Sequence, residues 1–374
     1  MRDPSQSGSL LVYIEPTGYV VAQIDALRNA WPGRVDPLFL TENLSQDWGI
    51  SPSGLGGRRL SSNRLAAVAE IWNLLRSGRY NLVHLAGWGD PLQLTAMLIA
   101  WARGIPVTIE SDTFEDSASS SLRRMIKRLL YPRLFRLPGL FLPGGHPQSD
   151  YLARFEVPSA RRRVAQMTVN VEGIRSHHAL NGAASRRSLR AALGIPEAAT
   201  VFIFVGRLEL HKGVKDLLIA FDNLGSPDRH LLIVGDGTLN RSVKDFAERN
   251  TCIHALGRLG AEDLLAAYAA SDVLVLPSHR EPWGLVVNEA LACDLPVLVS
   301  DRVGCAYDLV MGRGSGLIFQ AQSVEELTDA LRRMSQMATG RHVMVAAARE
   351  TISKWTMSAS AALITSAWRE VLSK

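Results

Sequence analysis

The chain of 374 residues has few cysteines and no long apolar run. Its three cysteines, Cys252, Cys293 and Cys305, form no C-x-x-C pair and lack the histidine spacing of a zinc site, so we expect neither a metal nor a disulfide. No stretch reaches the roughly 18 uninterrupted apolar residues of a membrane-spanning helix. The apolar run 10–14 is also shorter than a signal-peptide core of about 7–15 residues. The sequence predicts a soluble or peripheral protein of the reducing cytoplasm.

The composition also lacks any strong bias. The formal net charge is only +5, the hydrophobic fraction is 47%, and 30 glycines and 17 prolines are spread along the chain. These values exclude disordered, collagen-like and disulfide-scaffold proteins. Because single cores stop growing at roughly 250–300 residues, the length favours two domains.

Short apolar runs alternate with longer helical patterns along almost the whole chain, which is typical of parallel sheets with crossover helices. The runs are apolar throughout, as expected where helices cover both faces of a sheet. The strands expected in the first half are residues 10–15, 35–40, 82–85, 107–109 and 140–142. Those expected in the second half are residues 201–205, 231–235, 253–256, 273–276, 297–300 and 317–319. We therefore predict an α/β fold of two Rossmann-like, doubly wound domains.

The boundary between the domains is expected where the strand pattern lapses into a polar, Arg-rich stretch. We predict an N-terminal domain over 1–172, a linker over 173–185 and a C-terminal domain over 186–350. The last segment, 351–374, is helical in pattern and could pack back on the first domain. Open parallel sheets bind ligands at the carboxyl ends of their strands, so we expect the site in a cleft between the two domains.

Two cations follow the first strand of the second half. Gly206 and Arg207 come directly after residues 201–205, and Lys212 precedes a helical pattern that begins at Val214. A guanidinium fork, an ammonium and the amides of a helix N-terminus suit a diphosphate. On this local pattern alone, a solvated loop explains the two cations equally well.

Two carboxylates flank a later loop-to-helix junction. Glu281 lies on the loop after strand 273–276, and Glu289 lies in the first turns of the helix expected over 285–293. A carboxylate on a buried helix face needs hydrogen-bond donors, and vicinal sugar hydroxyls are such donors. Taken alone, Glu289 is more often a solvated helix residue.

The combination of motifs is more specific than its parts. It comprises Gly206-Arg207 with Lys212-Gly213, Val234-Gly235-Asp236-Gly237, the stretch from Pro277 through Glu281-Pro282-Trp283-Gly284 to Glu289-Ala290, and Leu295-Pro296-Val297. This series resembles the C-terminal half of a family 4 glycosyltransferase, a retaining enzyme of the glycosyl transferases group 1. Such enzymes have the GT-B fold, in which two Rossmann-like domains face each other across a cleft. The resemblance is close over 195–340 and covers the first half in outline.

The resemblance implies roles for individual residues. Arg207 and Lys212 match the cations that hold the nucleotide diphosphate and stabilise it as the leaving group. Glu281 is similar to the residue that contacts the donor sugar, and Glu289 to the one that binds the ribose hydroxyls. The family also implies backbone or base contacts at Gly206, Gly235, Gly257, Leu259, Gly284 and Leu285. It implies a nucleotide diphosphate sugar as donor and no required metal or other cofactor.

The first half matches the family less well. Of the glycine-rich loop expected after the first strand it has only Gly18. His84 stands where the family has a V-H-x-H segment, and we consider it both as an acceptor-side ligand and as a packed strand residue with a backbone partner. The segment 110–113 follows another strand, and within it Asp112 is our candidate for the acceptor side.

The positive charge is concentrated in one segment. Residues 121–190 contain 14 Lys and Arg against three acids, a local balance of +11, so the remaining residues are net acidic by −6. Within the segment, an amphipathic helix places Leu122, Met125, Ile126 and Leu129 on one face and Arg123, Arg124, Lys127 and Arg128 towards the other. Two interpretations stay open: a helix on an anionic membrane, or a surface helix with its apolar face in the core. The segment lacks aromatic interleaving or a recognition module, so we expect no nucleic-acid partner.

The sequence as a whole predicts a retaining glycosyltransferase with a UDP- or GDP-linked donor and a saccharide or lipid-linked acceptor. We expect it to work in cell-surface polysaccharide or glycolipid synthesis, in the cytoplasm or as a peripheral protein on the cytoplasmic face of the membrane. Two alternatives stay open: a non-catalytic GT-B protein that binds a nucleotide sugar or glycan, and a sugar-nucleotide epimerase of similar architecture.

Overall fold

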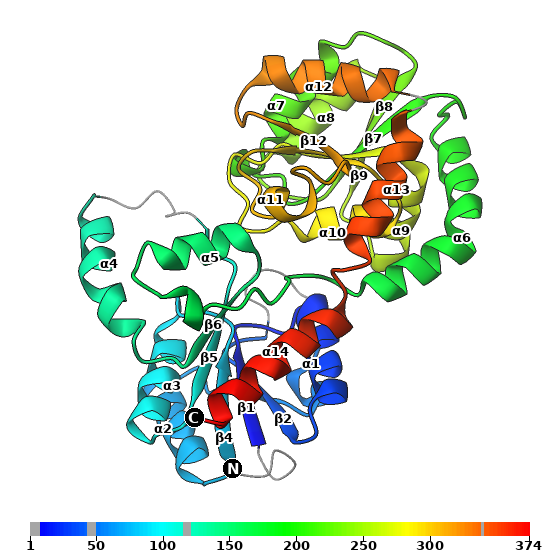
Figure 1. Ribbon diagram of the computed structural model, residues 1–374. Helices are drawn as coiled ribbons and strands as arrows, with labels where there is room; N and C mark the ends of the chain where they lie inside the picture. The colour runs from blue at the N-terminus through cyan, green and yellow to red at the C-terminus, as the bar shows by residue number, and fades with distance from the viewer. Residues whose placement is uncertain (1–7, 43–49, 115–120, 338–339) are drawn as a thin grey trace. The chain divides into compact units, whose positions relative to one another are not determined.

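The computed structural model describes residues 8–42, 50–114, 121–337 and 340–374, and the side chains of 121–123 lie outside the description. The chain divides into two compact units (Figure 1). The first extends to Val169 and also contains Met357–Lys374, and the second is Asn170–Thr356. Each unit has a six-stranded sheet flanked by helices. This confirms the predicted α/β fold class with two Rossmann-like domains.

The sheet of the first unit is parallel throughout, in the order β3-β2-β1-β4-β5-β6. Its strands are β1 (Gly8–Tyr13), β2 (Arg34–Phe39), β3 (Arg58–Arg59), β4 (Tyr80–Leu85), β5 (Val107–Ser111) and β6 (Leu140–Pro143). The five strands predicted for this half agree with the structure to within two residues. Strand β3 was not predicted, because two exposed arginines form no apolar run.

Helices cover both faces of this sheet. One core lies under α2 (Arg64–Arg76) and α3 (Pro91–Ala102), where the end of α4 (Ser121–Leu134) and α5 (His146–Ala153) also pack. The other lies under α1 (Gly18–Ala30) and the terminal helix α14 (Met357–Leu372). Short 3-10 turns, η2 (Pro52–Leu55) and η3 (Ser159–Arg161), lie in the connections.

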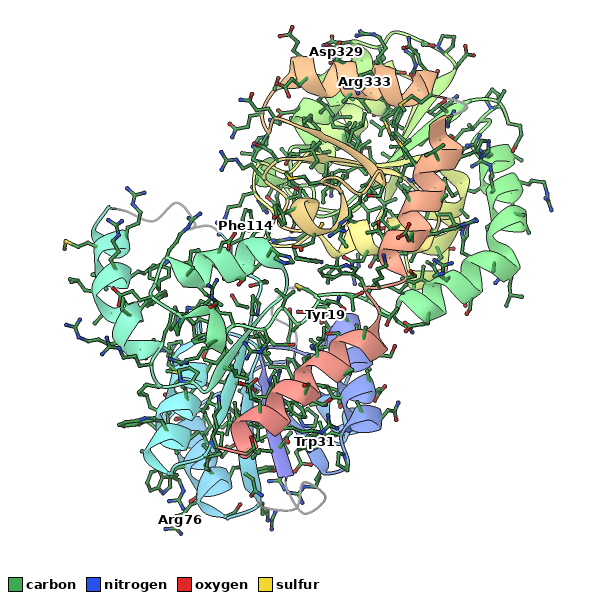
Figure 2. The ribbon with its side chains drawn as sticks, in the orientation of Figure 1. Tyr19, Trp31, Arg76, Phe114, Asp329 and Arg333 are labelled. Atoms are coloured by element: carbon green, nitrogen blue, oxygen red, sulfur yellow. The ribbon has the colours of Figure 1, made fainter. Side chains whose placement is uncertain are left out.

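The terminal helix α14 is part of the first unit's core. Its Trp368 is fully buried, with ring centroids 5.4 Å from those of both Trp31 and His84. Figure 2 shows Trp31 beside this helix. The helix begins at Met357 rather than at 351, because the chain up to Ile352 belongs to a helix of the second unit.

The sheet of the second unit has the corresponding parallel order, β12-β11-β10-β7-β8-β9. Its strands are β7 (Thr200–Val205), β8 (Arg229–Val234), β9 (Ile253–Gly257), β10 (Val273–Leu276), β11 (Val297–Ser300) and β12 (Gly316–Phe319). All six were predicted to within two residues. They were easy to recognise because most of their residues are apolar, and β7, β8, β10 and β11 are buried almost throughout, whereas β9 and β12 are partly exposed.

Two groups of helices accompany this sheet. The group that shares its main core is α7 (Val214–Asp222), α8 (Asn240–Arg249) and α12 (Val324–Gln336). The group whose members pack on one another is α6 (Val171–Ala192), α9 (Ala261–Ala270), α10 (Leu285–Ala292) and α13 (Gly340–Ile352). Two short elements, η4 (Leu210–Lys212) and α11 (Ala306–Leu309), follow strands of the sheet.

The predicted linker over 173–185 is wrong. These residues lie inside the 22-residue helix α6, and the division between the units falls at Asn170, whose side chain caps that helix by accepting from the Gly173 amide (3.0 Å). The stretch rich in Gly, Ala, Ser and Arg packs against α9. Near its end, the buried Arg190 donates to the Ala270 carbonyl (2.9 Å) and to Asp272 (2.8 Å). A composition that reads as a linker therefore builds a packed helix.

Candidate functional site

Each sheet has one point where the strand order reverses, between β1 and β4 in the first unit and between β7 and β10 in the second. At such a point the connections leave in opposite directions, and a crevice opens at the carboxyl ends of the strands. The candidate residues of each unit are therefore expected at that edge of its sheet.

The loop after β7 lies close to the loop after β8. Gly206 donates its amide to the Val234 carbonyl (3.0 Å). Gly235 has a φ of 141°, and a Cβ there would collide with the Gly206 carbonyl oxygen, so only glycine allows this approach. Next to it, the exposed guanidinium of Arg207 makes no hydrogen bond or ion pair with any residue in the described ranges. The loop after β7 thus places the exposed guanidinium of Arg207 at the switch point.

Lys212 and Glu281, which the sequence placed 69 positions apart, form an ion pair. Their side chains are only 15% and 12% exposed. The Ser278 hydroxyl also donates to Glu281 (3.4 Å). Since a buried charge without a partner is costly, the pair holds both side chains at this edge of the sheet. Two of the three predicted catalytic residues, Lys212 and Glu281, therefore belong to one arrangement.

The loop after β10 is held in place by contacts that the sequence did not reveal. His279 Nε2 lies 2.6 Å from the Asp216 carboxylate on α7, and the His279 amide donates to the His211 carbonyl (2.9 Å). The buried Trp283 donates to Asn288 (2.9 Å). Asp216 is an ordinary helix residue in sequence, and only the fold brings it to His279.

Glu289 lies one turn into α10, which begins after Gly284 (φ 96°). The Tyr268 hydroxyl on α9 donates to its Oε2 (2.7 Å). Burial raises the pKa of Glu289 to about 6, and the hydrogen bond from Tyr268 opposes that rise. Burial, and then the Glu289 carboxylate, hold the pKa of Tyr268 well above its ordinary range, so the phenol remains a donor. Glu289 is thus an oriented carboxylate that titrates near neutrality.

The other predicted nucleotide-side residues of this unit lie at the same edge of the sheet. Gly257 ends β9, and its carbonyl accepts from the Gly235 amide (2.8 Å). Leu259 is half-buried in the turn before α9, and Leu285 is the first residue of α10. Their positions agree with a ligand at the carboxyl ends of β7 to β10.

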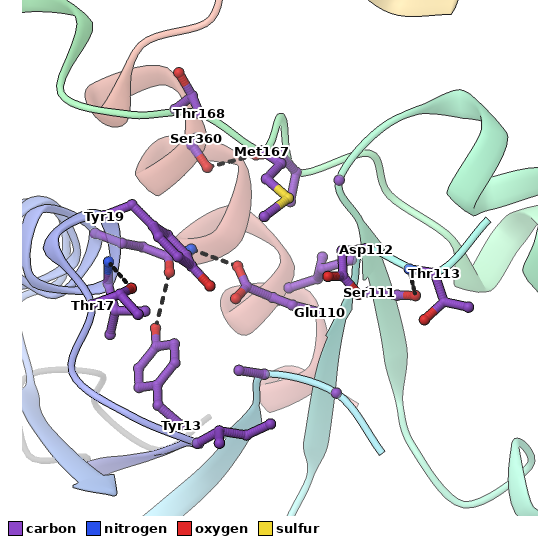
Figure 3. Close-up of a pocket in the computed structure, with 18 of the residues that line it drawn as sticks. Tyr13, Thr17, Tyr19, Glu110, Ser111, Asp112, Thr113, Met167, Thr168 and Ser360 are labelled. Atoms are coloured by element: carbon purple, nitrogen blue, oxygen red, sulfur yellow. Dashed lines mark hydrogen bonds between the residues drawn. The ribbon is translucent and has the colours of Figure 1, made fainter. Parts of the chain in front are cut away.

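The first unit has a cavity of about 380 Å³ at the carboxyl ends of β1, β4 and β5 (Figure 3). The polar side chains in its wall include Tyr13, Tyr19, Gln93, Glu110 and Asp112. Asp112, the acceptor-side candidate of the sequence, lines this cavity.

Glu110 is held by a hydrogen-bond relay. The side-chain amide of Gln23 joins Glu110 to Tyr13. Its Nε2 donates to Glu110 Oε1 (2.6 Å), and its Oε1 accepts from the Tyr13 hydroxyl (3.2 Å). Burial, followed by the nearby Glu110 carboxylate, raises the pKa of Tyr13 well above its ordinary value. The sequence named 110–113 as a segment, but it did not single out Glu110.

His84 does not reach this cavity, which corrects its assignment as an acceptor-side ligand. Its side chain is fully buried, and its Nδ1 accepts from the Trp368 indole (3.4 Å) and lies 2.9 Å from the Thr108 hydroxyl. Its Nε2 lies 3.6 Å from Glu110 Oε2, which is beyond hydrogen-bond distance. Of the two interpretations, His84 is therefore the packed strand residue, and the partners of its Nδ1 are side chains.

Gly18 is the first residue of α1, between two residues that line the cavity. A Cβ at Gly18 would meet no atom within 4 Å, so packing does not require glycine there.

Helix α4 carries the predicted basic residues. Arg124 and Arg128 are exposed and Lys127 is half-buried over the Tyr131 ring, whereas the side chain of Arg123 lies outside the described part of the chain. One of the two interpretations placed the apolar face of this helix in the core. That interpretation is wrong for residues 124–130. Large apolar residues there are exposed: Met125 by 54%, Ile126 by 43%, Leu129 by 56% and Leu130 by 57%.

Among the described residues, the structure has neither a metal-binding cluster nor a membrane-spanning helix. Over the residues that the structure describes, no group of three His, Cys, Asp or Glu side chains gathers where it could hold a metal ion. Within the same ranges, no helix combines the length and the apolarity needed to cross a membrane.

Known proteins are similar to this chain in sequence and in fold. Residues 185–351 match the family model described as glycosyl transferases group 1. A D-inositol 3-phosphate glycosyltransferase from Saccharomonospora viridis is 33% identical over 202 residues, which are 50% of this chain and 47% of that protein. The chain thus aligns with about half the length of this curated relative.

Solved structures match almost the whole chain. A sucrose-phosphate synthase from Thermosynechococcus elongatus superimposes with a TM-score of 0.76 at 19% identity, covering 98% of this chain and 99% of that one. HepE from Anabaena, in complex with UDP, does so with a TM-score of 0.79 at 16% identity over 97% and 100% of the two chains. Residues 185–351 are thus similar to the glycosyl transferases group 1, and the chain as a whole shares the two-domain fold of these solved structures.

Proposed function

We propose that the chain is a retaining glycosyltransferase of family 4, which moves a sugar from a nucleotide diphosphate donor to a saccharide or lipid-linked acceptor. The observation that carries the proposal is the Lys212–Glu281 pair beside Arg207, an exposed cation with no ion-pair partner among the described residues, at one switch point. HepE from Anabaena, which has the same fold, was crystallised with UDP-glucose, and this favours a UDP sugar over a GDP sugar. Cell-surface polysaccharide or glycolipid synthesis is the proposed setting.

The mechanism follows from where charge develops. The acceptor oxygen bonds to the anomeric carbon on the face from which the diphosphate leaves, and the bond from that carbon to the phosphate oxygen breaks. The acceptor proton passes to the departing diphosphate. Arg207 and Lys212 stabilise the negative charge that grows on this leaving group, and preorganised cations act most strongly in such a site. No metal is needed in this scheme.

The two carboxylates bind rather than transfer protons. Glu281, paired with Lys212, accepts from hydroxyls of the donor sugar. Glu289, with one oxygen held by Tyr268, accepts from the ribose hydroxyls. The amides at the start of α10 meet the phosphates, where the helix dipole favours negative charge.

Arg207→Ala and Lys212→Ala test these roles. We expect each variant to lower kcat by about 100-fold, the scale found when a transition-state donor is removed. Circular dichroism and the melting temperature report whether the fold is intact. Arg241→Ala is the matched control, since it removes an 89%-exposed side chain on α8. Unimpaired transfer by Arg207→Ala or Lys212→Ala would contradict the role of that residue.

Release of free nucleoside diphosphate separates the alternatives. A transferase releases it with acceptor present and forms a new glycoside. A non-catalytic binding protein leaves the donor intact, and an epimerase interconverts the donor sugar without an acceptor.

We also propose that α4 holds the enzyme on an anionic membrane surface, such as the cytoplasmic leaflet. Its Met125, Ile126, Leu129 and Leu130 are exposed and are not part of the core cluster among the described residues, while Tyr131 and Leu134 pack against that core. Exposed apolar side chains beside cations are the arrangement with which interfacial helices insert among lipid headgroups. Each nearby cation contributes on the order of 1 kcal/mol.

Vesicle sedimentation tests the membrane proposal. Charge reversal at Arg123, Arg124, Lys127 and Arg128 should weaken binding to vesicles with 30% phosphatidylserine by at least tenfold, on the basis of about 1 kcal/mol per cation. The control reverses exposed arginines of the second unit, Arg241, Arg332 and Arg333, the last of which Figure 2 shows on α12. Equal binding by wild type and the α4 variant would contradict the proposal.

A further inference from the structure

The cavity of the first unit contains a buried polar side chain with no partner. Gln93, the third residue of α3, is fully buried and lines the cavity. Neither its Nε2 nor its Oε1 has a hydrogen-bond partner among the described residues, so exchanging the two atoms would not change this result. An unsatisfied buried amide is costly, and the great majority of buried polar groups are paired. The group therefore points to a ligand.

An amide side chain presents one acceptor and two donors side by side. Vicinal hydroxyls present a matching donor and acceptor on adjacent carbons. Glu110, in the same wall, offers carboxylate oxygens, one of which is held by Gln23. The Tyr13 phenol donates to Gln23, and the Tyr19 phenol remains a donor because burial and the nearby Asp112 and Glu110 carboxylates raise its pKa. The wall is thus suited to a ligand with several hydroxyls.

The charge of the wall limits the ligand further. Its ionisable members are three carboxylic acids, Glu15, Glu110 and Asp112, and two phenols, and no Lys, Arg or His lines it among the described residues. A phosphate or carboxylate in this cavity would face carboxylates without a compensating cation.

We propose that this cavity takes the accepting end of an uncharged, polyhydroxylated sugar, that Gln93 bonds two of its vicinal hydroxyls, and that phosphorylated sugars are excluded. The proposal rests on the proposed function, since it names the acceptor class of the same reaction. Gln93 is then a specificity residue that touches substrate.

The test uses the full chain and a nucleotide sugar that it binds, identified by calorimetry from a panel of UDP and GDP sugars. Acceptors are the octyl glycosides of glucose, galactose, mannose and N-acetylglucosamine, each beside its 6-phosphate. We expect at least one unphosphorylated member to accelerate nucleoside diphosphate release, and its phosphate to be at least tenfold less effective. Preference for the phosphorylated members, or acceleration by none of the neutral ones, would overturn the proposal.

Variants assign the effect to Gln93. Gln93→Leu should raise the acceptor KM by about tenfold and leave the donor KM unchanged. Gln148→Leu removes another fully buried glutamine, on α5 outside the cavity wall, and should change neither value. Should Gln93→Leu fail to fold, Asp112→Lys at the exposed rim supplies the missing cation and should narrow the discrimination against the 6-phosphates. An unchanged acceptor KM in folded Gln93→Leu, or unchanged discrimination in Asp112→Lys, contradicts the proposal.

The two proposals can fail separately. If no nucleotide sugar binds, the proposed function is wrong. If a donor binds and is turned over but the acceptor preference is reversed, only the assignment of the cavity is wrong.

Discussion

Removal of one hydroxyl should change how donor binding depends on pH. Tyr268→Phe deletes the phenol that donates to Glu289 (2.7 Å) and keeps the ring that packs in the core. Burial raises the pKa of Glu289 to about 6, and the lost hydrogen bond had opposed that rise. The pKa of Glu289 should therefore rise further in the variant.

The size of the effect follows from the hydrogen bond. A bond to an ionised group contributes about 1.5 kcal/mol, and one pKa unit corresponds to about 1.4 kcal/mol, so the pKa should move to about 7. If the ionised carboxylate binds the ribose, affinity rises with pH through this pKa. At pH 6, about half of the wild-type carboxyl groups are ionised, against roughly one in eleven in the variant. The variant should bind about fivefold more weakly at pH 6 and almost equally at pH 8.

Isothermal calorimetry between pH 5 and 8 measures this shift. The ligand should be the intact nucleotide sugar, because its doubly esterified diphosphate does not titrate in that range. Glu289→Gln is the control: an amide cannot ionise, so its affinity should be nearly independent of pH. The reasoning is refuted if Tyr268→Phe has the same midpoint as wild type, or if Glu289→Gln retains the full dependence on pH.

Three further predictions concern stability. Asp272→Asn should lower the free energy of unfolding by about 3 kcal/mol in urea titrations, because the buried Arg190 loses its ionised partner, and a loss under 1 kcal/mol would contradict this. Trp368→Ala should cost about 3–5 kcal/mol by removing a fully buried ring that packs on Trp31, and an unchanged melting temperature would show that α14 is dispensable. The folded pKa of Glu289 lies above its ordinary 4.5, so its contribution is fully present below pH 4.5 and about 2 kcal/mol is lost as pH rises through 6. Glu289→Gln should remove that loss from denaturation curves, and an unchanged pH profile would contradict it.

The strands and helices were largely predictable because most of them show a local pattern of apolar residues, and these patterns repeat along the chain. Strands buried on both faces are rich in apolar residues, and eleven of the twelve strands were predicted from their apolar residues. The exception, Arg58–Arg59, is an exposed pair at a sheet edge, where pairing depends on the neighbouring strand. Helix α6 was missed because small residues and arginines carry no strong apolar period, and its stability comes from packing on α9.

The site in the second unit was predictable where spacing carries the chemistry. Four residues of this motif stand just after strands or near the start of a helix, so the motif can be recognised from their spacing in the sequence. They are Arg207, Lys212, Glu281 and Glu289. The contacts that orient them, from Tyr268 and from Asp216 through His279, depend on side chains that only the fold brings together. For the same reason, the unpartnered Gln93 could not be found from sequence.

Product analysis by NMR tests the central claim most directly. The protein would be incubated with an α-linked nucleotide sugar and the octyl glycoside acceptors, and the new anomeric proton followed beside free nucleoside diphosphate. The account predicts one α-glycoside per nucleoside diphosphate released, and about 100-fold slower formation with Lys212→Ala. A β-linked product, or an altered donor sugar formed without acceptor, would contradict it.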